Sequence, residues 1–290
     1  YMPVDVVGLE SRVIMIAAGR HHTCALTANG GVKCWGENMG QLGDGTTEQR
    51  LTPVDVMGLT GGVVEIAAGL GHTCAVIMTG GVKCWGTNSQ GQLGDGTTTT
   101  RLTPVNVLDD PSGWLEPISD IAAISAGGYH TCAVTTAGGA KCWGNNYHGQ
   151  LGYGSGGGGL LDNYSTLADD VVGLSSGVEA ISCGGGFAHT CAVMTTGGVK
   201  CWGSNYYGQL GDGTTYDRWT PVDVYNLTSG VAAISAGKYG HTCALTSGRS
   251  VKCWGKNTSG ELGDGTNTQR LTPVDVAVSY THLRAHETVL

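Results

Sequence analysis

The residues best suited to chemistry in this sequence are cysteines that recur in pairs, each pair preceded by a histidine. The pattern is His-Thr-Cys followed by Lys-Cys-Trp-Gly, with ten residues from the first cysteine to the second. A histidine and two cysteines can ligate zinc, and two cysteines can form a disulfide or stay reduced in a protein core. The pairs are Cys24 with Cys34, Cys74 with Cys84, Cys132 with Cys142, Cys191 with Cys201, and Cys243 with Cys253, and the histidines are His22, His72, His130, His189 and His241.

The segment that joins the two cysteines has the composition of a β-hairpin. In the first copy, Thr23–Thr27 and Val32–Trp35 are β-prone, and Ala28–Gly31 between them supplies a tight turn. A symmetric turn places the two cysteines directly opposite each other, where Cβ atoms are about 4.5–5.5 Å apart. One disulfide per repeat is therefore the favoured interpretation. Zinc is disfavoured because five identical sites without a short Cys-x-x-Cys spacing would be needed, and reduced core cysteines are the other alternative.

The eleventh cysteine, Cys183, does not belong to any pair. It follows the apolar segment Ala180-Ile181-Ser182, at a position where the other copies have alanine. A small, buried free thiol is the expected outcome. The equivalent alanines are Ala18, Ala68, Ala126 and Ala236.

The whole chain is built on this repeat, which recurs about every fifty residues. Each copy is expected to supply four short strands, which in the first copy are Pro3–Val7, Val13–Ala18, His22–Thr27 and Gly31–Gly36. Four short strands per repeat predict an all-β fold, a β-propeller with one four-stranded blade per repeat. The expected repeats are 1–50, 51–101, 102–152, 153–217 and 218–270, with the start of a sixth at 271–276.

Residues 277–290 share nothing with the repeat. The stretch Val278–Thr288 resembles the translation of a transposase adapter used to prepare DNA libraries, so a non-native tail is expected. The sequence also begins within a repeat, which indicates a longer parent protein.

Composition narrows the classes of function. The net charge of −8 argues against a nucleic-acid partner. The sequence contains no run of twenty apolar residues, so no membrane span is predicted. Paired cysteines in this number are typical of an oxidising compartment, so an extracellular or cell-surface location is expected although no signal peptide is visible.

The repeated motif resembles the regulator of chromosome condensation repeat family. The resemblance covers residues 3–276 and rests on HTCAL, GGVKCWGxNxxGQLGDGT and the preceding IAAG and TPVxV segments. It implies a β-propeller, typically with seven blades, of which this chain would contain five complete repeats; closure of five blades is the alternative. The paired cysteines resemble a bacterial, secreted member most closely.

No catalytic constellation is apparent, so an enzyme is not expected, and no cofactor or metal is predicted. The Asp-Gly pairs of the LGDGT segments are typical of turns and lack the several spaced oxygen ligands of a calcium site. The recurring histidines are expected to bond to backbone between strands, and the recurring tryptophans to pack between blades. These tryptophans are Trp35, Trp85, Trp143, Trp202 and Trp254, and the Asp-Gly residues are Asp44, Asp95, Asp212 and Asp264.

Positions that vary between copies on a fixed frame predict a binding surface. Aromatic rings gather at these positions in the third to fifth repeats, where they suit partner binding. We expect a monomer that recognises a protein or cell-surface component through one propeller face. The alternatives are a nucleotide exchange factor for a small GTPase, a binding module of a larger secreted wall-associated protein, and neutral variation of exposed loops. The candidate residues are Tyr129, Tyr147, His148, Phe187, Tyr206, Tyr207 and Tyr239.

Overall fold

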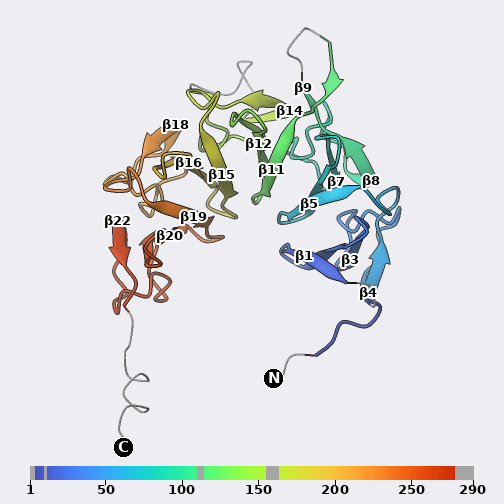
Figure 1. The fold of residues 1–290 in the computed structure, drawn as a ribbon, viewed down its shortest axis with the longest axis horizontal. Coiled ribbons are helices and arrows are strands. Elements are labelled where there is room, and N and C mark those ends of the chain that lie inside the picture. Colours follow the sequence, from blue (N-terminus) through green and yellow to red (C-terminus); the bar gives the residue numbers. More distant parts are fainter. Residues whose placement is uncertain (1–3, 10–11, 110–113, 155–162, 278–290) are drawn as a thin grey trace, which may run out of the picture.

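The computed structural model describes residues 4–9, 12–109, 114–154 and 163–277, and their regular structure is entirely β-strand (Figure 1). Five four-stranded antiparallel sheets follow one another along the chain. Within the described residues, no helix could cross a membrane. The expected tail at 277–290 lies outside these residues except for Ala277.

The strands follow the same order in every sheet, and each strand pairs with the next. The first sheet contains β1 (Val13–Ala18), β2 (His22–Thr27), β3 (Val32–Gly36) and β4 (Arg50–Asp55). The second contains β5 (Val63–Ala68), β6 (His72–Ile77), β7 (Val82–Gly86) and β8 (Arg101–Asn106). The third contains β11 (Ile121–Ala126), β12 (His130–Thr135), β13 (Ala140–Asn145) and β14 (Tyr164–Asp170). The fourth contains β15 (Val178–Cys183), β16 (His189–Met194), β17 (Val199–Gly203) and β18 (Arg218–Asp223).

The fifth sheet contains β19 (Val231–Ala236), β20 (His241–Thr246), β21 (Val251–Gly255) and β22 (Arg270–Asp275). A two-residue pair, β9 (Leu108–Asp109) and β10 (Glu116–Pro117), lies between the second and third sheets in the chain. The sheets form an arc with the first strand of each on its inner side (Figure 1). The arc is open between the first and fifth sheets, and the fold is a β-propeller.

The central hairpin of each sheet has the predicted register. In the first sheet Cys24 lies opposite Cys34, and the turn is closed by the Gly30 N–H, which donates to the Thr27 carbonyl. Gly30 has a φ of +79°, which suits glycine.

The predicted disulfides are confirmed in all five sheets, and the reduced and zinc-ligated alternatives are wrong for these ten cysteines. Each disulfide closes the central hairpin of its own sheet, ten residues apart in the chain. The bonds join Cys24 to Cys34, Cys74 to Cys84, Cys132 to Cys142, Cys191 to Cys201, and Cys243 to Cys253. Cys183 is the free, buried cysteine, as expected.

One expected strand grouping is wrong. The Thr-Pro-Val segment, expected to open each unit as in Pro3–Val7 and Pro53–Met57, instead closes the preceding sheet. Strand β4 pairs with β3, and the segment Pro273–Val276, expected to begin a sixth unit, belongs largely to β22 of the fifth sheet. Residues 4–7 form no strand, and Pro3 lies outside the described residues.

Two ion pairs accompany this grouping in the first sheet. Lys33 on β3 binds Asp55 on β4 at 2.7 Å, and Arg50 at the start of β4 binds Asp44 in the loop after β3 at 2.7 Å. Both contacts tie the Thr-Pro-Val segment to the hairpin before it. The equivalent residues make the same two contacts in the fourth and fifth sheets.

A buried hydroxyl group connects each sheet to the next. His22 Nε2 lies 2.8 Å from the Thr73 hydroxyl, which donates to the backbone carbonyl of Gln41 at 2.9 Å. The Trp85 indole N–H donates to the same carbonyl. Because the threonine proton is used on Gln41, the histidine must donate through Nε2. The expectation of a backbone partner is therefore wrong for that nitrogen, since its partner is a side chain of the next sheet. It holds for the other ring nitrogen of one equivalent histidine, because His189 Nδ1 lies 3.1 Å from the Phe187 backbone carbonyl.

The junction recurs with the same geometry between the later sheets. The equivalent sets are His72, Thr131, Gln92 and Trp143; His130, Thr190, Gln150 and Trp202; and His189, Thr242, Gln209 and Trp254. Each of these tryptophans, like Trp85, is fully buried and packs in a core cluster with the disulfide cysteines of the preceding sheet. Trp35, which belongs to the first sheet of the described residues, is only half-buried.

Burial makes these histidines neutral. It lowers the pKa of His72 and His130 to about 3 and that of His22 and His189 to about 4. In the unfolded chain the same groups protonate near their ordinary value of about 6.5. The unfolded state therefore binds more protons as the pH falls below about 6.5.

We expect the free energy of unfolding to fall as the pH is lowered from 6.5 towards 4. Each buried histidine contributes up to about 1.4 kcal/mol per pH unit in that range. Replacing His130 by Asn should make this slope shallower by about that amount, besides weakening the junction. Urea unfolding of both proteins across the pH range measures the slopes. Identical slopes would contradict a neutral His130 in the folded state.

Removing one disulfide should lower stability without changing the fold. For the Cys191→Ala, Cys201→Ala double variant, loop-closure entropy predicts a loss of about 2–3 kcal/mol in the free energy of unfolding. Cys183→Ala serves as the control because Cys183 closes no loop and alanine stands at the equivalent position elsewhere. Equal stability of the double variant and the control would argue against a stabilising hairpin disulfide.

Candidate protein-interaction surface

The candidate residues lie on two loops of each sheet. The first loop joins the first and second strands and is closed at its base by a backbone hydrogen bond, such as that from Gly184 N–H to the His189 carbonyl. The residues between these two anchors, 185–188 in the fourth sheet, differ from sheet to sheet. This loop can therefore change in sequence without disturbing the strands that carry it.

The second loop joins the third and fourth strands and is held by a buried asparagine. In the fourth sheet, Asn205 donates to Asp212 at 3.1 Å and to the Thr214 carbonyl, and it accepts from the Leu210 N–H at 3.0 Å. The Tyr207 N–H donates to Gln209 Oε1 at 2.8 Å. These bonds fix the ends of a turn whose tip presents the side chains of residues 206 and 207.

The aspartates of this second loop are already saturated with hydrogen bonds. Asp95 accepts bonds from Asn88, from the Thr97 hydroxyl and N–H, and from Arg101. Burial by itself would raise the pKa of Asp95, but the bonds from Thr97 and Arg101 outweigh it and lower the pKa. The carboxylate therefore holds the loop together through these hydrogen bonds, as expected for an Asp-Gly turn.

Four of the seven predicted residues form one cluster between the fourth and fifth sheets. Phe187 and Tyr207 meet edge to face with ring centroids 5.0 Å apart, and Tyr206 and Tyr207 do so at 4.8 Å. Lys256 lies over the rings of Tyr207 and Tyr239 at 5.7 and 6.0 Å. We call Phe187, Tyr206, Tyr207, Tyr239, Lys238 and Lys256 the aromatic–lysine patch.

The patch combines exposed rings with restrained ones. Tyr206 is 69% exposed and Tyr239 is 55% exposed, whereas Phe187 and Tyr207 are half-buried beneath them. Lys238 lies 5.6 Å from the centre of the Tyr239 ring. Lys256 also forms an ion pair with Glu261, with 3.6 Å between Nζ and Oε1.

The other three predicted residues lie apart from the patch. Tyr147 and His148 contact each other edge to face, and His148 Nδ1 lies 2.8 Å from Asp217, which links the loops of the third and fourth sheets. Burial alone would raise the pKa of Asp217, but hydrogen bonds from His148 and the Asn205 N–H lower it. Tyr129 lines a pocket of about 400 Å³ on the first and second sheets, together with Arg20 and Met39.

The two lysines of the patch were not among the predicted residues. Lys256 occupies the variable position of the Trp-Gly-x-Asn segment, where the other copies have Glu37, Thr87, Asn145 and Ser204. That variation was the available signal. The placement of Lys256 over two rings follows from the packing of neighbouring sheets, which the sequence pattern does not give.

The fold and the repeated junction define a β-propeller of repeated hairpin blades. The chain belongs to the RCC1-like domain family, whose model matches residues 1–289.

Relatives and solved structures agree with this family. The chain is 33% identical over 278 residues to the ultraviolet-B receptor UVR8 of Arabidopsis thaliana, covering 94% of this chain and 60% of the relative. It is 32% identical over 188 residues to the mitochondrial RCC1 domain-containing protein RUG3 of the same plant, and this match covers 64% of the chain and 40% of RUG3. The chain thus spans about half the length of these relatives.

The structural neighbours share the fold. Yeast RCC1 (Prp20), in its complex with Kap60, matches with a TM-score of 0.78 at 20% identity, covering 93% of this chain and 62% of the neighbour. Human WBSCR16 matches with a TM-score of 0.75 at 22% identity, covering 92% and 67%. The ectodomain of the Physcomitrella patens receptor kinase CR4 has a TM-score of 0.50 at 20% identity, covering 88% and 53%.

Calcium should not stabilise the protein, because the loop aspartates already have hydrogen-bond partners for their oxygens. Adding calcium chloride should leave the thermal midpoint unchanged. By contrast, Asp95→Ala should lower the free energy of unfolding by about 2–3 kcal/mol, since it leaves buried donors without an acceptor. The exposed Asp223→Ala is the control and should cost less than about 1 kcal/mol. A midpoint raised by calcium in the parent but not in Asp95→Ala would overturn this assignment.

Proposed function

We propose that this propeller recognises a protein partner through the aromatic–lysine patch. The observation that carries the proposal is the clustering of four aromatic rings and two lysines on the loops of adjacent sheets. The patch lies at positions that vary between copies, while the strands and junctions beneath it repeat. Recognition therefore needs no change in the scaffold.

Tyrosine clusters of this kind suit protein binding for energetic reasons. A tyrosine ring gives a large contact area with few rotatable bonds, so little conformational entropy is lost when a partner covers it. Here the edge-to-face contacts of Tyr207 with its neighbours restrain the rings before binding. This restraint supports a role for the exposed Tyr206 as a main contact. Tyr239, exposed and beside Lys238 and Lys256, is the other.

The charges of the patch favour a partner with acidic groups. Lys238 and Lys256 lie beside the rings of Tyr207 and Tyr239, and Glu261 offsets only part of their charge. A partner carboxylate at this place would gain charge-assisted hydrogen bonds. A surrounding protein with a net charge of −8 would repel acidic partners elsewhere, which helps to confine them to the patch.

We place this recognition outside the cell or at its surface, in a monomeric and secreted member of the family, with a bacterial source as the proposed subtype. Five disulfides are compatible with an oxidising compartment. A binding module within a larger wall-associated protein is the related alternative, and it predicts that the chain sediments with cell walls.

The second candidate is a regulatory exchange factor for a small GTPase. It is favoured by the fold of a structural neighbour, yeast Prp20p, whose binding to Gsp1p and histones is the subject of its structure report. On the loops among the described residues, no acidic wedge that could serve that reaction is identified. Release of labelled GDP from a Ras-like GTPase, with and without the protein, separates this candidate from simple recognition.

Photo-crosslinking from single sites of the full chain tests the proposed surface. A photoreactive amino acid replaces Tyr206, Tyr239 or the control Tyr225, which is 58% exposed and lies outside the patch. Proteins of the source organism's extracellular fraction should crosslink at the two patch sites and not at the control. Equal crosslinking at all three sites would reject a surface confined to the patch.

Affinity for the crosslinked partner then tests the energetic contribution of the rings. Tyr206→Ala and Tyr239→Ala should each weaken binding about tenfold or more, corresponding to a loss of about 1.4 kcal/mol or more. Tyr225→Ala should leave the affinity unchanged. Calorimetry with the purified partner measures all three, and retained affinity in both patch variants would refute the proposal.

A further inference from the structure

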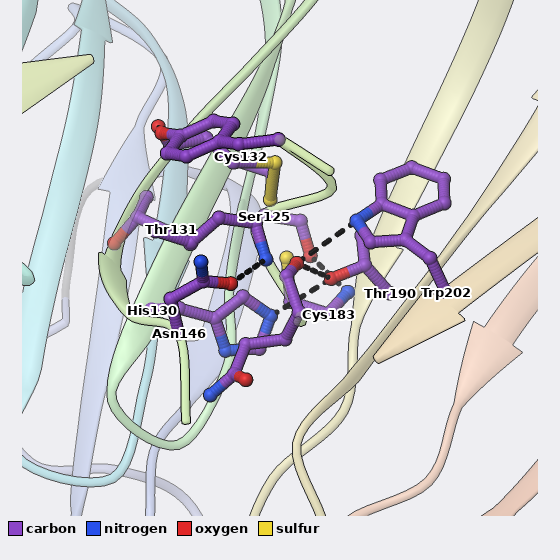
Figure 2. The surroundings of a disulfide bond; sticks show 12 residues. Ser125, His130, Thr131, Cys132, Asn146, Cys183, Thr190 and Trp202 are labelled. Atoms are coloured by element: carbon purple, nitrogen blue, oxygen red, sulfur yellow. Dashed lines mark hydrogen bonds between the residues drawn. A yellow bond between two sulfur atoms is a disulfide. The ribbon is translucent and has the colours of Figure 1, made fainter. Parts of the chain in front are cut away.

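The junction between the third and fourth sheets differs chemically from the other three. It contains Cys183, at the end of β15, where the equivalent first strands end in alanine. Cys183 is buried and pairs with Thr190 on β16, the threonine of this junction. The free thiol therefore lies within the packed interface between two sheets (Figure 2).

This thiol lies close to a disulfide of the neighbouring sheet. The sulfur of Cys183, the sulfur of Cys132 and a ring nitrogen of His130 all lie within 4.8 Å of one another. Cys132 is bonded to Cys142 across the hairpin of β12 and β13. Figure 2 shows Cys183 and His130 grouped beside this disulfide, with His130 hydrogen-bonded to Thr190.

The same three residues resemble a metal-binding set, but the disulfide excludes that use. A cysteine ligates a metal as a thiolate, and Cys132 has no thiolate while it is bonded to Cys142. A thiol beside a disulfide has a different reaction available, in which the thiolate attacks one sulfur and displaces the other. Cys132 is the sulfur that belongs to the close group with Cys183.

We propose that Cys183 exchanges with the Cys132–Cys142 disulfide and can thereby join the third and fourth sheets covalently. Cys183 gives up its thiol proton, and its sulfur forms a bond to the Cys132 sulfur. The Cys132–Cys142 bond breaks, and its electron pair stays on Cys142, which takes up a proton. The number of disulfides is unchanged, so the step needs no oxidant or reductant.

The exchange changes what the bond connects. The original disulfide links two strands of one hairpin, which backbone pairing already holds together. The new bond would link β12 of the third sheet to β15 of the fourth sheet and leave Cys142 as the free thiol. A tie within one sheet would thus become a tie between two sheets.

The environment of Cys183 sets the conditions for the reaction. Burial raises the pKa of the thiol to about 12, although hydrogen bonds with Ser125 and Thr190 offset part of this effect. The thiolate is therefore scarce at neutral pH. As long as the pH is below the pKa of the thiol, the exchange rate should rise about tenfold for each unit by which the pH is raised. Cys183 also lines a pocket of about 150 Å³ at the inner ends of the first strands, with Gly127 and Gly185.

Peptide mapping of the native full chain tests the exchange. The protein is incubated at mildly alkaline pH, labelled with an alkylating reagent, and digested after Lys, Arg and Glu without reduction. Cys132 then lies in peptide 102–141, because the bond between Glu116 and Pro117 is not cleaved. Cys142 lies in 142–179, and Cys183 lies in 180–200 together with Cys191. Before exchange, 102–141 is linked to 142–179. After exchange it is linked to 180–200, and the label moves from Cys183 to Cys142.

Two controls separate exchange from general scrambling. The Cys191–Cys201 disulfide has alanine, Ala236, at the position equivalent to Cys183 on the next sheet, so it should stay intact. Cys183→Ala should keep the Cys132–Cys142 link throughout. A label confined to Cys183 after incubation, or label spread over all cysteines, would overturn the proposal.

A second variant tests the proximity of Cys132 and Cys183 without relying on Cys142 as the leaving group. In Cys142→Ala, Cys132 and Cys183 are both free thiols in the same junction. Oxidised glutathione should convert them to a Cys132–Cys183 disulfide, detected as a loss of both alkylation sites and a link between 102–141 and 180–200. A folded Cys142→Ala protein that keeps both thiols under these conditions would refute the proximity on which the proposal rests.

Discussion

The buried threonine hydroxyl at each sheet junction is the constraint on which this propeller depends. It accepts a hydrogen bond from the histidine of the sheet before it and donates one to a glutamine carbonyl, which also accepts the indole N–H of tryptophan. A polar group buried without partners costs free energy, so these bonds must form together when the sheets pack. The junction therefore couples the position of one sheet to that of the next, and the apolar packing of tryptophan on the preceding disulfide strengthens the same interface.

A rigid junction allows the loops above it to vary. Buried asparagines and saturated aspartates hold the ends of each long loop, while one backbone bond closes each short loop. The side chains at the tips are then free to differ between copies. In the fourth and fifth sheets this freedom places aromatic rings from separate loops in contact, and the resulting patch belongs to no single repeat.

The hairpins could be predicted because their geometry is local. A symmetric turn alone places Cys24 opposite Cys34, and the structure has that register. The fourth strand could not be assigned in this way, since it is attached by backbone pairing across a long folded loop, with Gly36 opposite Arg50, and the residue pattern does not specify that register. The histidine partner was also out of reach, because Thr73 lies 51 residues from His22. The grouping of Tyr207 with Lys256 likewise requires knowledge of how neighbouring sheets pack.

The exceptional residue of the chain is best understood against the regular junction. Replacement of alanine by Cys183 changes little in the packing, since the His130, Thr190 and Gln150 bonds keep the geometry of the other junctions. It does add a nucleophile beside a sulfur that every repeat already carries. A single small substitution can thus give one interface a chemistry that its sisters lack, because the repeated frame has already placed the second reactant. The same logic, a fixed frame with local exceptions, accounts for the aromatic–lysine patch.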